Sequence, residues 1–484
     1  MGRSTRPKFS MQSDMSTFQQ KLSRRSALEH VGAGFGMLAL QGMLAEQSVA
    51  SLPNRAANPF AVQPPHHRAT AKRCIFIYLP GGPSQIDLFD PKPEVTRQNG
   101  KPLPFEKPEL FRTDTSDLFA SKFKFRQHGQ SGIEVSELLP HIANCIDDIC
   151  VVRSMVTDNI NHGGAALQMH TGEQAFSRPA IGAWVTYGLG SENQNLPGFV
   201  VISPNAVFQN GPLYSSSFLP AAYQGTWIRD LANPIANLKS TPLSRQRQRA
   251  QIDTLQQLHE LNRESSSNAE ALDARIAAFE LAYRMQIQAP EAFLIDKETE
   301  ATKRLYGIDQ PHTEPIGRQL LLARRLAERG VRFIQVFDSQ DGNNIWDHHT
   351  GINKKLPNNC AQTDLPVAGL IKDLKNRGML DDTLVVWGGE FGRTPTAEGS
   401  DGREHHPFGF TMWLAGGGIQ GGHVHGSTDD FGWHAVQDKV HVHDLHATIL
   451  HALGLDHERL TYRYSGRDFR LTDVYGHVVK EILV

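Results

Sequence analysis

Histidine and acidic side chains recur shortly after apolar segments of this chain, where they could bind a metal ion or move protons. The chain has 484 residues with 22 histidines, and ten of these lie between His348 and His446. Imidazole nitrogens and carboxylate oxygens are common ligands of divalent metals, and histidine changes its charge near neutral pH. A single histidine is more often a surface or core residue, but this concentration favours metal binding or acid–base chemistry.

The first two candidate motifs follow apolar runs in the N-terminal half. Asp87 and Asp90 come after Cys74–Leu79, beyond a turn that contains two glycines. For either aspartate, the alternative is a residue that only shapes the turn. His162 follows Ile149–Met155 at the expected start of a helix, where backbone N–H groups can bind an anion.

The third motif, Asp347-His348-His349, follows the apolar run Val331–Phe337. An acidic residue followed closely by two histidines has a suitable spacing for a divalent metal. The alternative is a loop in which polar residues are adjacent by chance. The motif therefore gains weight only together with the others.

The fourth motif is a glycine-rich segment after the apolar run Thr383–Trp387. It contains Glu390, a carboxylate at an expected strand end, and Arg393, whose planar guanidinium suits an oxyanion. The segment 402–407 adds a further arginine and two histidines, which are Arg403, His405 and His406.

The elements that must position these motifs are short apolar strands. The runs are rich in β-branched residues and are separated by helix-length segments, which is typical of strands covered on both faces of a mainly parallel sheet. The alternation predicts an α/β fold with three layers. Because ligands bind beyond the carboxyl ends of such strands, the motifs are expected to meet at one edge. The runs are Cys74–Leu79, Ile149–Met155, Phe199–Ile202, Val331–Phe337, Thr383–Trp387 and Phe410–Ala415.

A helical insertion interrupts the strand pattern at about residues 241–310. This segment is polar, with apolar residues at three- and four-residue steps, and predicts two helices broken at Ser265–Ser267. A further helix is expected over Ile316–Arg329, ended by Gly330. We expect residues 71–484 to form one domain that includes this insertion.

The N-terminus has the layout of an export signal. Ser23-Arg24-Arg25 and Leu28 precede a short apolar run, which resembles a twin-arginine signal peptide over residues 1–50. An amphipathic helix of the mature domain is the alternative. Residues 51–70 are rich in proline, alanine and asparagine and are interpreted as a linker.

Composition argues against two classes of partner. The chain has 49 Lys+Arg and 51 Asp+Glu, a formal net charge of −2, which offers no electrostatic surface for nucleic acid. No segment is long and apolar enough for a stable transmembrane anchor. The four cysteines are too few for a disulfide framework, and Cys74 and Cys150 are expected to be buried in apolar runs.

Taken together, the motifs resemble one known family. Nearly the whole mature chain resembles the bacterial family known as domain of unknown function 1501. That family is in turn similar to the sulfatase and alkaline phosphatase superfamily, which implies a three-layer, alkaline-phosphatase-like sandwich around a mainly parallel sheet. The stretches that carry the resemblance are GGPSQIDLFDPKP, INHGGAALQMHTGE, WDHH, VVWGGEFGRTP, GREHHPFGFTMWLAGGGIQGG and HVHDLHATILHALGL.

The superfamily holds up to two metals at strand ends, and the resemblance carries its positions onto this chain. His162 corresponds to the nucleophile at the helix start and is either a nucleophile or a metal ligand. Phe391 falls where a metal-binding histidine is expected, and the segment around Asp444 corresponds to a structural helix. The implied metal ligands are Asp87, His162, Asp347, His349 with His348 as its rival, Glu390, and His405 or His406.

The resulting expectation is a periplasmic, metal-dependent hydrolase of sulfate or phosphate esters on a small molecule or a polysaccharide. Mixed oxygen and nitrogen ligands favour zinc or manganese, with calcium as a further candidate. Arg393 or Arg403 would steady the developing negative charge. Sulfatases and phosphatases need Cys, Ser or Thr where this chain has His162. The alternatives are therefore a non-catalytic, metal-containing binding protein on the same fold and, as a third interpretation, an iron-dependent oxidoreductase.

Overall fold

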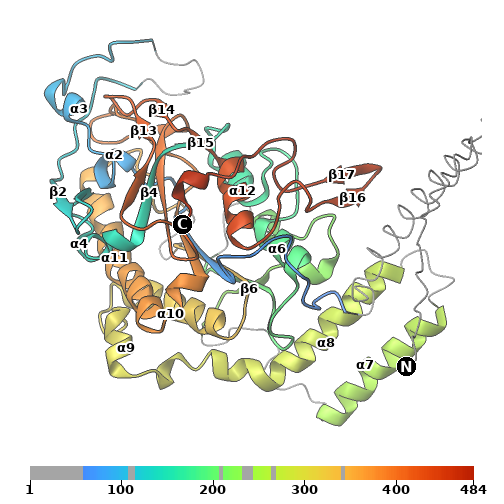
Figure 1. The fold of residues 1–484 in the computed structure, drawn as a ribbon. Helices are drawn as coiled ribbons and strands as arrows, with labels where there is room; N and C mark the ends of the chain where they lie inside the picture. The colour runs from blue at the N-terminus through green and yellow to red at the C-terminus, as the bar shows by residue number, and fades with distance from the viewer. Residues whose placement is uncertain (1–57, 107–114, 206–210, 232–243, 263–268, 340–343) are drawn as a thin grey trace, which may run out of the picture. The chain divides into compact units, whose positions relative to one another are not determined.

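A nine-stranded sheet forms the centre of the protein (Figure 1). This computed structural model describes residues 58–106, 115–205, 211–231, 244–262, 269–339 and 344–484. The signal peptide predicted for residues 1–50 lies outside the described residues, as do residues 51–57 of the predicted linker. The described residues all belong to the unit Arg55–Val484.

The six predicted strands are confirmed, with ends that differ by at most two residues. They are β1 (Arg73–Tyr78), β4 (Ile149–Val156), β5 (Phe199–Ile202), β7 (Phe333–Phe337), β8 (Thr383–Gly388) and β11 (Phe410–Ala415).

The order of strands across the sheet is β12-β4-β11-β8-β1-β7-β5-β6. Two strands of this order were not predicted, namely β6 (Thr226–Ile228) and β12 (His423–His425). The ninth strand of the sheet, the short β15 (Val440–His441), pairs with β4 outside this order and was not predicted either. Within the described sheet, β11 is antiparallel to both of its neighbours and the other pairings are parallel. The prediction of a mainly parallel sheet is therefore confirmed, and the loops after the parallel strands share one edge.

The two faces of the sheet are covered by separate cores, as alternating side chains of β1 show. Ile75 and Ile77 pack in one core, together with residues of α10 (Glu314–Glu328) and α11 (Ile352–Asn376). Cys74 and Phe76 pack in the other core. That second core contains residues of α5 (His162–Thr171), α6 (Ile181–Leu189) and α12 (Val442–Ala452). Burying each large apolar side chain contributes about 1.5–3 kcal/mol to the stability of the fold. The helices on both faces therefore fix the positions of the strands, and with them the loops at the strand ends.

The helical insertion is present as a pair of long helices, α7 (Arg245–Asn262) and α8 (Ala269–Ala292). Arg249 of α7 donates to Glu280 of α8 over 2.9 and 2.6 Å. The predicted break at Ser265–Ser267 lies outside the described residues. The following helix, α10, begins at Glu314, two residues before its predicted start.

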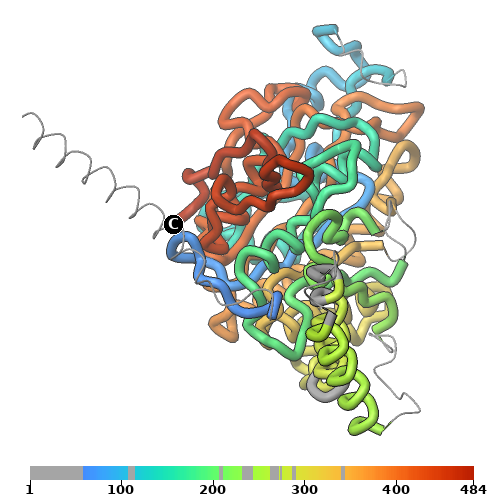
Figure 2. The backbone as a smooth tube through the Cα atoms, turned by 90° about the vertical axis from the view of Figure 1, so that its right-hand side faces the viewer, coloured from blue at the N-terminus to red at the C-terminus, as the bar shows by residue number. Residues whose placement is uncertain are grey.

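The beginning of the described chain runs beside its C-terminal part (Figure 2). His66 donates its backbone N–H to the carbonyl of Gly454 over 2.8 Å, and Thr70 donates to Ala452 over 2.9 Å. The described part of the predicted linker is thus irregular but tied to the end of α12. None of the helices in the described ranges is long and apolar enough to cross a membrane. All four cysteines are buried, as expected for Cys74 and Cys150.

Candidate metal centre

Three segments that follow strands of the sheet bring four potential metal ligands together. His162 is the first residue of α5, after β4. Asp347 and His349 lie in the loop after β7, and His405 begins the two-residue strand β10 (His405–His406). One ligand atom from each of these four residues lies within 4.8 Å of the others. We call the four residues the central cluster.

The Nε2 atoms of the three histidines converge on the Asp347 carboxylate. His349 Nε2 lies 3.0 Å from Asp347 Oδ1, and His162 Nε2 lies 3.1 Å from Asp347 Oδ2. His405 Nε2 lies 3.4 Å from Asp347 Oδ1 and 3.0 Å from His349 Nε2. Zinc–nitrogen bonds of about 2.0–2.1 Å place the ligand atoms of one tetrahedral ion about 3.3 Å apart. The separations in the central cluster therefore fit one ion.

The other ring nitrogen of each histidine is held from outside the cluster. His162 Nδ1 lies 2.6 Å from Glu390 Oε1, and His405 Nδ1 lies 2.7 Å from the backbone carbonyl of Ile160. His349 Nδ1 contacts the carboxylate of Glu398. An acceptor at Nδ1 holds a proton there, so that each Nε2, once it has lost its own proton to a metal, would direct its lone pair inward, the arrangement that metal-binding histidines usually have. This shared orientation supports ligation more strongly than the residue types do.

The charge around the central cluster also favours a cation. Asp347 lies among three further carboxylates, those of Glu390, Glu398 and Glu404, against the single guanidinium of Arg393. Once His162 and His349 have given up their protons to a metal, four carboxylates and one guanidinium leave an excess of negative charge in a largely buried site. A divalent ion would balance this excess.

The pKa values show the same preference for positive charge. Burial lowers the pKa of His162, but its contacts with Asp347 and Glu390 outweigh this and raise the pKa to about 9. Burial would raise the pKa of Asp347, yet hydrogen bonds from the three histidines hold it well below its usual range. Asp347 is therefore ionised, and the site stabilises a positive charge beside it.

The backbone around the site is shaped by close approaches that only glycine allows. A Cβ atom on Gly81, which has φ +116°, would lie 2.4 Å from the backbone nitrogen of Asp347. A Cβ atom on Gly402 would lie 1.7 Å from the carbonyl oxygen of His349. The Gly81 N–H donates to Glu390 over 2.9 Å, so this turn also orients the carboxylate that holds His162.

Arg393 lies behind the central cluster. Its guanidinium donates to Asp347 Oδ1 over 2.5 Å and to the backbone carbonyls of Gly82 and Arg403 over 3.0 and 3.1 Å. The side chain is fully buried. Arg393 therefore positions Asp347 in this structure and does not reach the surface where a substrate would bind.

The structure places Asp87 and Arg403 together, outside the central cluster. Arg403 Nε donates to Asp87 Oδ2 over 2.8 Å, and Ser84 Oγ donates to the same oxygen over 2.6 Å. Arg403 is fully buried, and it also donates to Asp87 Oδ1 over 3.3 Å and to the Thr394 carbonyl over 3.0 Å. The predicted metal ligand and the predicted catalytic arginine thus form a buried ion pair that supports the loops.

Of each pair of adjacent histidines, one member lies in the central cluster and the other lies in the core. His348 is fully buried, and burial lowers its pKa to about 3. His406 Nε2 lies 2.6 Å from the carbonyl oxygen of Trp433, and burial lowers its pKa to about 4. His405 and His406 point to opposite sides because they form a strand, in which side chains alternate.

Sequence reasoning missed the outer contacts of the site. Glu398, Glu404 and the Ile160 carbonyl were not predicted from the spacing of the motifs. Glu404 directly precedes His405 and His406 in the sequence, so its carboxylate could have been predicted to lie near the site. Glu398 and Ile160 lie near no recognisable motif, and only the folded loops show their role. Glu390 was predicted as a ligand, and the structure places it behind His162.

The central cluster opens to solvent on one side. The side chain of His349 is 35% exposed and that of Asp347 is 23% exposed, whereas Glu390 is buried. A small group in solvent can therefore approach the ligand atoms from the side of the loop after β7. The fold and the cluster define an α/β protein with a candidate metal site at the carboxyl ends of its strands.

The family model described as "Protein of unknown function (DUF1501)" matches residues 71–483, and the chain belongs to this family. The predicted family is thus confirmed. No curated protein matches the chain.

Solved structures that resemble the chain include a sulfatase, a lipoteichoic acid synthase and an alkaline phosphatase. The PsFucS1 sulfatase from Pseudoalteromonas sp. is 12% identical with a TM-score of 0.35, over 81% of this chain and 69% of that one. The lipoteichoic acid synthase LtaP from Listeria monocytogenes is 11% identical with a TM-score of 0.34, over 86% and 79%. The alkaline phosphatase from the Antarctic bacterium TAB5 is 13% identical with a TM-score of 0.30, over 72% and 92%.

Proposed function

We propose that this protein is a metal-dependent hydrolase of sulfate or phosphate esters. The observation that carries the proposal is the orientation of the central cluster, in which three Nε2 atoms and the Asp347 carboxylate share one point. A divalent ion held there supplies a Lewis acid and a bound water of lowered pKa. Three nitrogen ligands favour zinc, with manganese as the next candidate, over calcium, which prefers oxygen ligands.

The chain's own residues prepare this chemistry by fixing the ligands. Glu390, Glu398 and the Ile160 carbonyl hold the three imidazoles in one tautomer. Arg393 fixes the Asp347 carboxylate. Preorganised ligands need no rearrangement when substrate arrives, which is how a rigid site lowers a barrier.

His162 acts as a ligand in this proposal and not as a nucleophile. Both of its ring nitrogens are engaged, Nδ1 with Glu390 and Nε2 toward Asp347. A covalent intermediate at His162 would require one of these contacts to break. The attacking group is therefore water, which also explains how the site can do without Ser, Cys or Thr at this position.

The test is a screen of metal-saturated protein against 4-nitrophenyl sulfate, 4-nitrophenyl phosphate and bis(4-nitrophenyl) phosphate. We expect turnover of at least one ester, lost in Asp347→Asn and retained in His406→Gln, which changes a histidine outside the cluster. Metal-loaded protein that hydrolyses none of them would contradict the proposal. That result would favour the second candidate, a non-catalytic metal-binding protein, which the burial of Arg393 and Arg403 supports.

Export through the twin-arginine route is part of the proposal. It rests on Arg24-Arg25 and the apolar run that follows, all within the N-terminal residues outside the described range. Replacing both arginines with lysine should retain the full-length protein inside the cell in a fractionation experiment. Unchanged export of that variant would contradict this route.

A further inference from the structure

Tyr78 is a buried tyrosine at the end of β1, close to the candidate metal centre. It is only 1% exposed, and it packs in the second core together with Cys74 and Phe76 of the same strand. That core also contains residues of α5, the helix that begins with His162. Because side chains alternate along a strand, Tyr78 is the last residue of β1 on the face that α5 covers.

The phenol of Tyr78 is a hydrogen-bond donor to Glu390, the carboxylate behind His162. Tyr78 Oη donates to Glu390 Oε2 over 2.7 Å. The other oxygen, Oε1, accepts from the Gly81 N–H over 2.9 Å and lies 2.6 Å from His162 Nδ1. A carboxylate held at both oxygens cannot turn without losing a hydrogen bond, and Glu390 is buried, so water does not replace the lost partner. Tyr78 therefore fixes the side of Glu390 that faces away from His162.

The sheet and two neighbouring rings hold Tyr78 itself in place. In the sheet it pairs with Phe337 of β7 on one side and with Gly388 of β8 on the other, two residues before Glu390. Its ring meets the rings of His170 and Phe337 edge to face, at 4.5 and 5.2 Å between centres. Such edge-to-face contacts favour one ring orientation. The position of the hydroxyl is thus set by the core of the protein.

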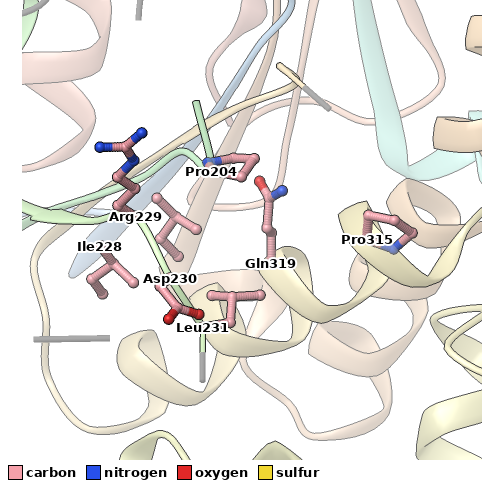
Figure 3. Close-up of a pocket in the computed structure, with 8 residues that line it drawn as sticks. Pro204, Ile228, Arg229, Asp230, Leu231, Pro315 and Gln319 are labelled. Carbon is pink, nitrogen blue, oxygen red and sulfur yellow. The ribbon is translucent and has the colours of Figure 1, made fainter. Parts of the chain in front are cut away.

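Another buried polar side chain near the strand ends is not held in this way. Gln319 lines a cavity of about 390 Å³ at the ends of β5 and β6, together with Ile228 and Pro315 (Figure 3). It is 2% exposed, yet its Oε1 atom is buried without a hydrogen-bond partner. Gln319 is therefore a suitable control for a buried polar group that positions nothing in the central cluster.

We propose that Tyr78 is a positioning residue of the candidate metal centre, which acts on His162 through Glu390. With both oxygens of Glu390 held, His162 Nδ1 keeps its acceptor and Nε2 stays directed at Asp347 Oδ2, 3.1 Å away. Without the phenol, Oε2 loses its donor and the carboxylate can turn, so the imidazole is held less well. The proposal rests on the metal binding within the proposed function and is independent of the ester chemistry.

The experiment compares the zinc affinity of two Tyr→Phe variants by chelator competition. Tyr306 is the matched control, because it is fully buried and its hydroxyl donates to Asp373 over 3.0 Å, outside the central cluster. Tyr78→Phe should bind zinc about tenfold more weakly, whereas Tyr306→Phe and Gln319→Leu should stay within about threefold of wild type. Both Tyr→Phe variants should lower the melting temperature of the metal-free protein, since each removes a donor from a buried carboxylate.

Two results of this comparison would overturn the proposal. One is a zinc affinity of Tyr78→Phe within about threefold of wild type. The other is an equal loss of zinc affinity in Tyr306→Phe, which would show that the effect follows from lowered stability and not from the position of His162.

A double-mutant cycle tests whether Tyr78 acts through Glu390. In a Glu390→Ala background the phenol has no carboxylate to hold, so adding Tyr78→Phe should change zinc affinity by less than about twofold. A further loss of about tenfold in that background would overturn the proposal, because it would mean that the two residues act independently.

The visible spectrum of the cobalt-loaded protein gives a readout that stability alone does not move. The absorption bands of bound cobalt depend on the arrangement of its ligands. We expect Tyr306→Phe to reproduce the wild-type bands and Tyr78→Phe to shift them, since His162 is held less well. Identical spectra for all three proteins would overturn the proposal.

The positioning role and the proposed chemistry can fail separately. If zinc affinity falls in Tyr78→Phe but no ester is hydrolysed by the zinc-loaded wild type, the proposed function fails and the role of Tyr78 stands. If esters are hydrolysed and Tyr78→Phe binds zinc as tightly as wild type, the role of Tyr78 fails and the proposed function stands.

Discussion

Two regions of this protein combine several histidines with an aspartate, but their imidazoles point differently. In one region the Nε2 atoms point toward a common centre, and in the other they point to separate partners in the fold. In the central cluster, Nε2 atoms of three histidines converge on Asp347. The second region, which we call the α12 cluster, surrounds the start of α12. It consists of Asp158, His441, His443 and His446.

In the α12 cluster each ring serves the fold. His441 caps the helix by accepting from the His443 N–H over 3.2 Å, while its Nε2 donates to Asp158 over 3.1 Å. His443 and His446 each direct Nε2 to a backbone carbonyl, over 2.9 and 2.8 Å. The groups of potential ligands found among the described residues include none of these side chains. The direction in which the ring nitrogens point, and not the number of histidines, therefore makes a metal site.

The largest expected effect is the loss of metal when the central cluster is broken. Asp347→Asn combined with His349→Gln removes two of four ligands, so metal content by elemental analysis should fall from about one equivalent to near zero. The matched change in the other region, Asp158→Asn with His441→Gln, should keep the wild-type content. If both double variants lost the same amount of metal, the metal site could not be assigned to the central cluster alone.

Adjacent histidines offer a finer version of the same comparison. His405→Gln removes a ligand and should lower metal affinity at least about a hundredfold in a chelator competition. His406→Gln changes the neighbour that contacts Trp433, and should lower the melting temperature while leaving metal affinity within about threefold. If His406→Gln lost metal affinity and His405→Gln kept it, the assignment of His405 as the ligand would be wrong.

The outer contacts should have a smaller effect than the ligands. Glu398→Gln leaves His349 in place but weakens the acceptor at its Nδ1, and metal affinity should fall about 10- to 100-fold. Glu458→Gln, an exposed carboxylate beyond α12, serves as the control. If metal affinity is unchanged in Glu398→Gln, the orientation of His349 does not depend on that contact.

The smallest effect concerns acid and involves the α12 cluster. Burial lowers the pKa of His446 to about 3, so the unfolded chain binds a proton at higher pH than the folded one. The free energy of unfolding should therefore fall as the pH drops below about 6.5, by about 1 kcal/mol for this histidine at pH 6. Denaturant titrations of His446→Gln should show a correspondingly shallower pH dependence. The exposed His434→Gln should leave the slope unchanged.

The sequence was sufficient for six of the nine strands of the sheet and for the loops that carry the site. Short, continuous apolar runs that are rich in β-branched residues, such as Thr383–Trp387, are typical of buried strands. Parallel strands then bring the loops that follow them to one edge of the sheet. The sequence could not decide between His405 and His406, because that choice depends on the pairing of β10 with β9 (Gly392–Arg393).

Contacts between residues far apart in the sequence could not be predicted either. Asp87 looked like a metal ligand because it follows β1, yet it pairs with Arg403, which is 316 residues away. The same holds for Glu398, whose contact with His349 joins two loops of different strands. Local patterns predict which segments approach one another, but the partner of each charge depends on side-chain packing.

The most direct test of the central claim is the anomalous scattering of crystals grown with zinc, measured on both sides of the zinc absorption edge. We expect one strong peak bonded to Nε2 of His162, His349 and His405 and to the Asp347 carboxylate, at about 2.0–2.2 Å from each atom. A peak at the α12 cluster with none at Asp347, or no peak in zinc-saturated protein, would contradict it.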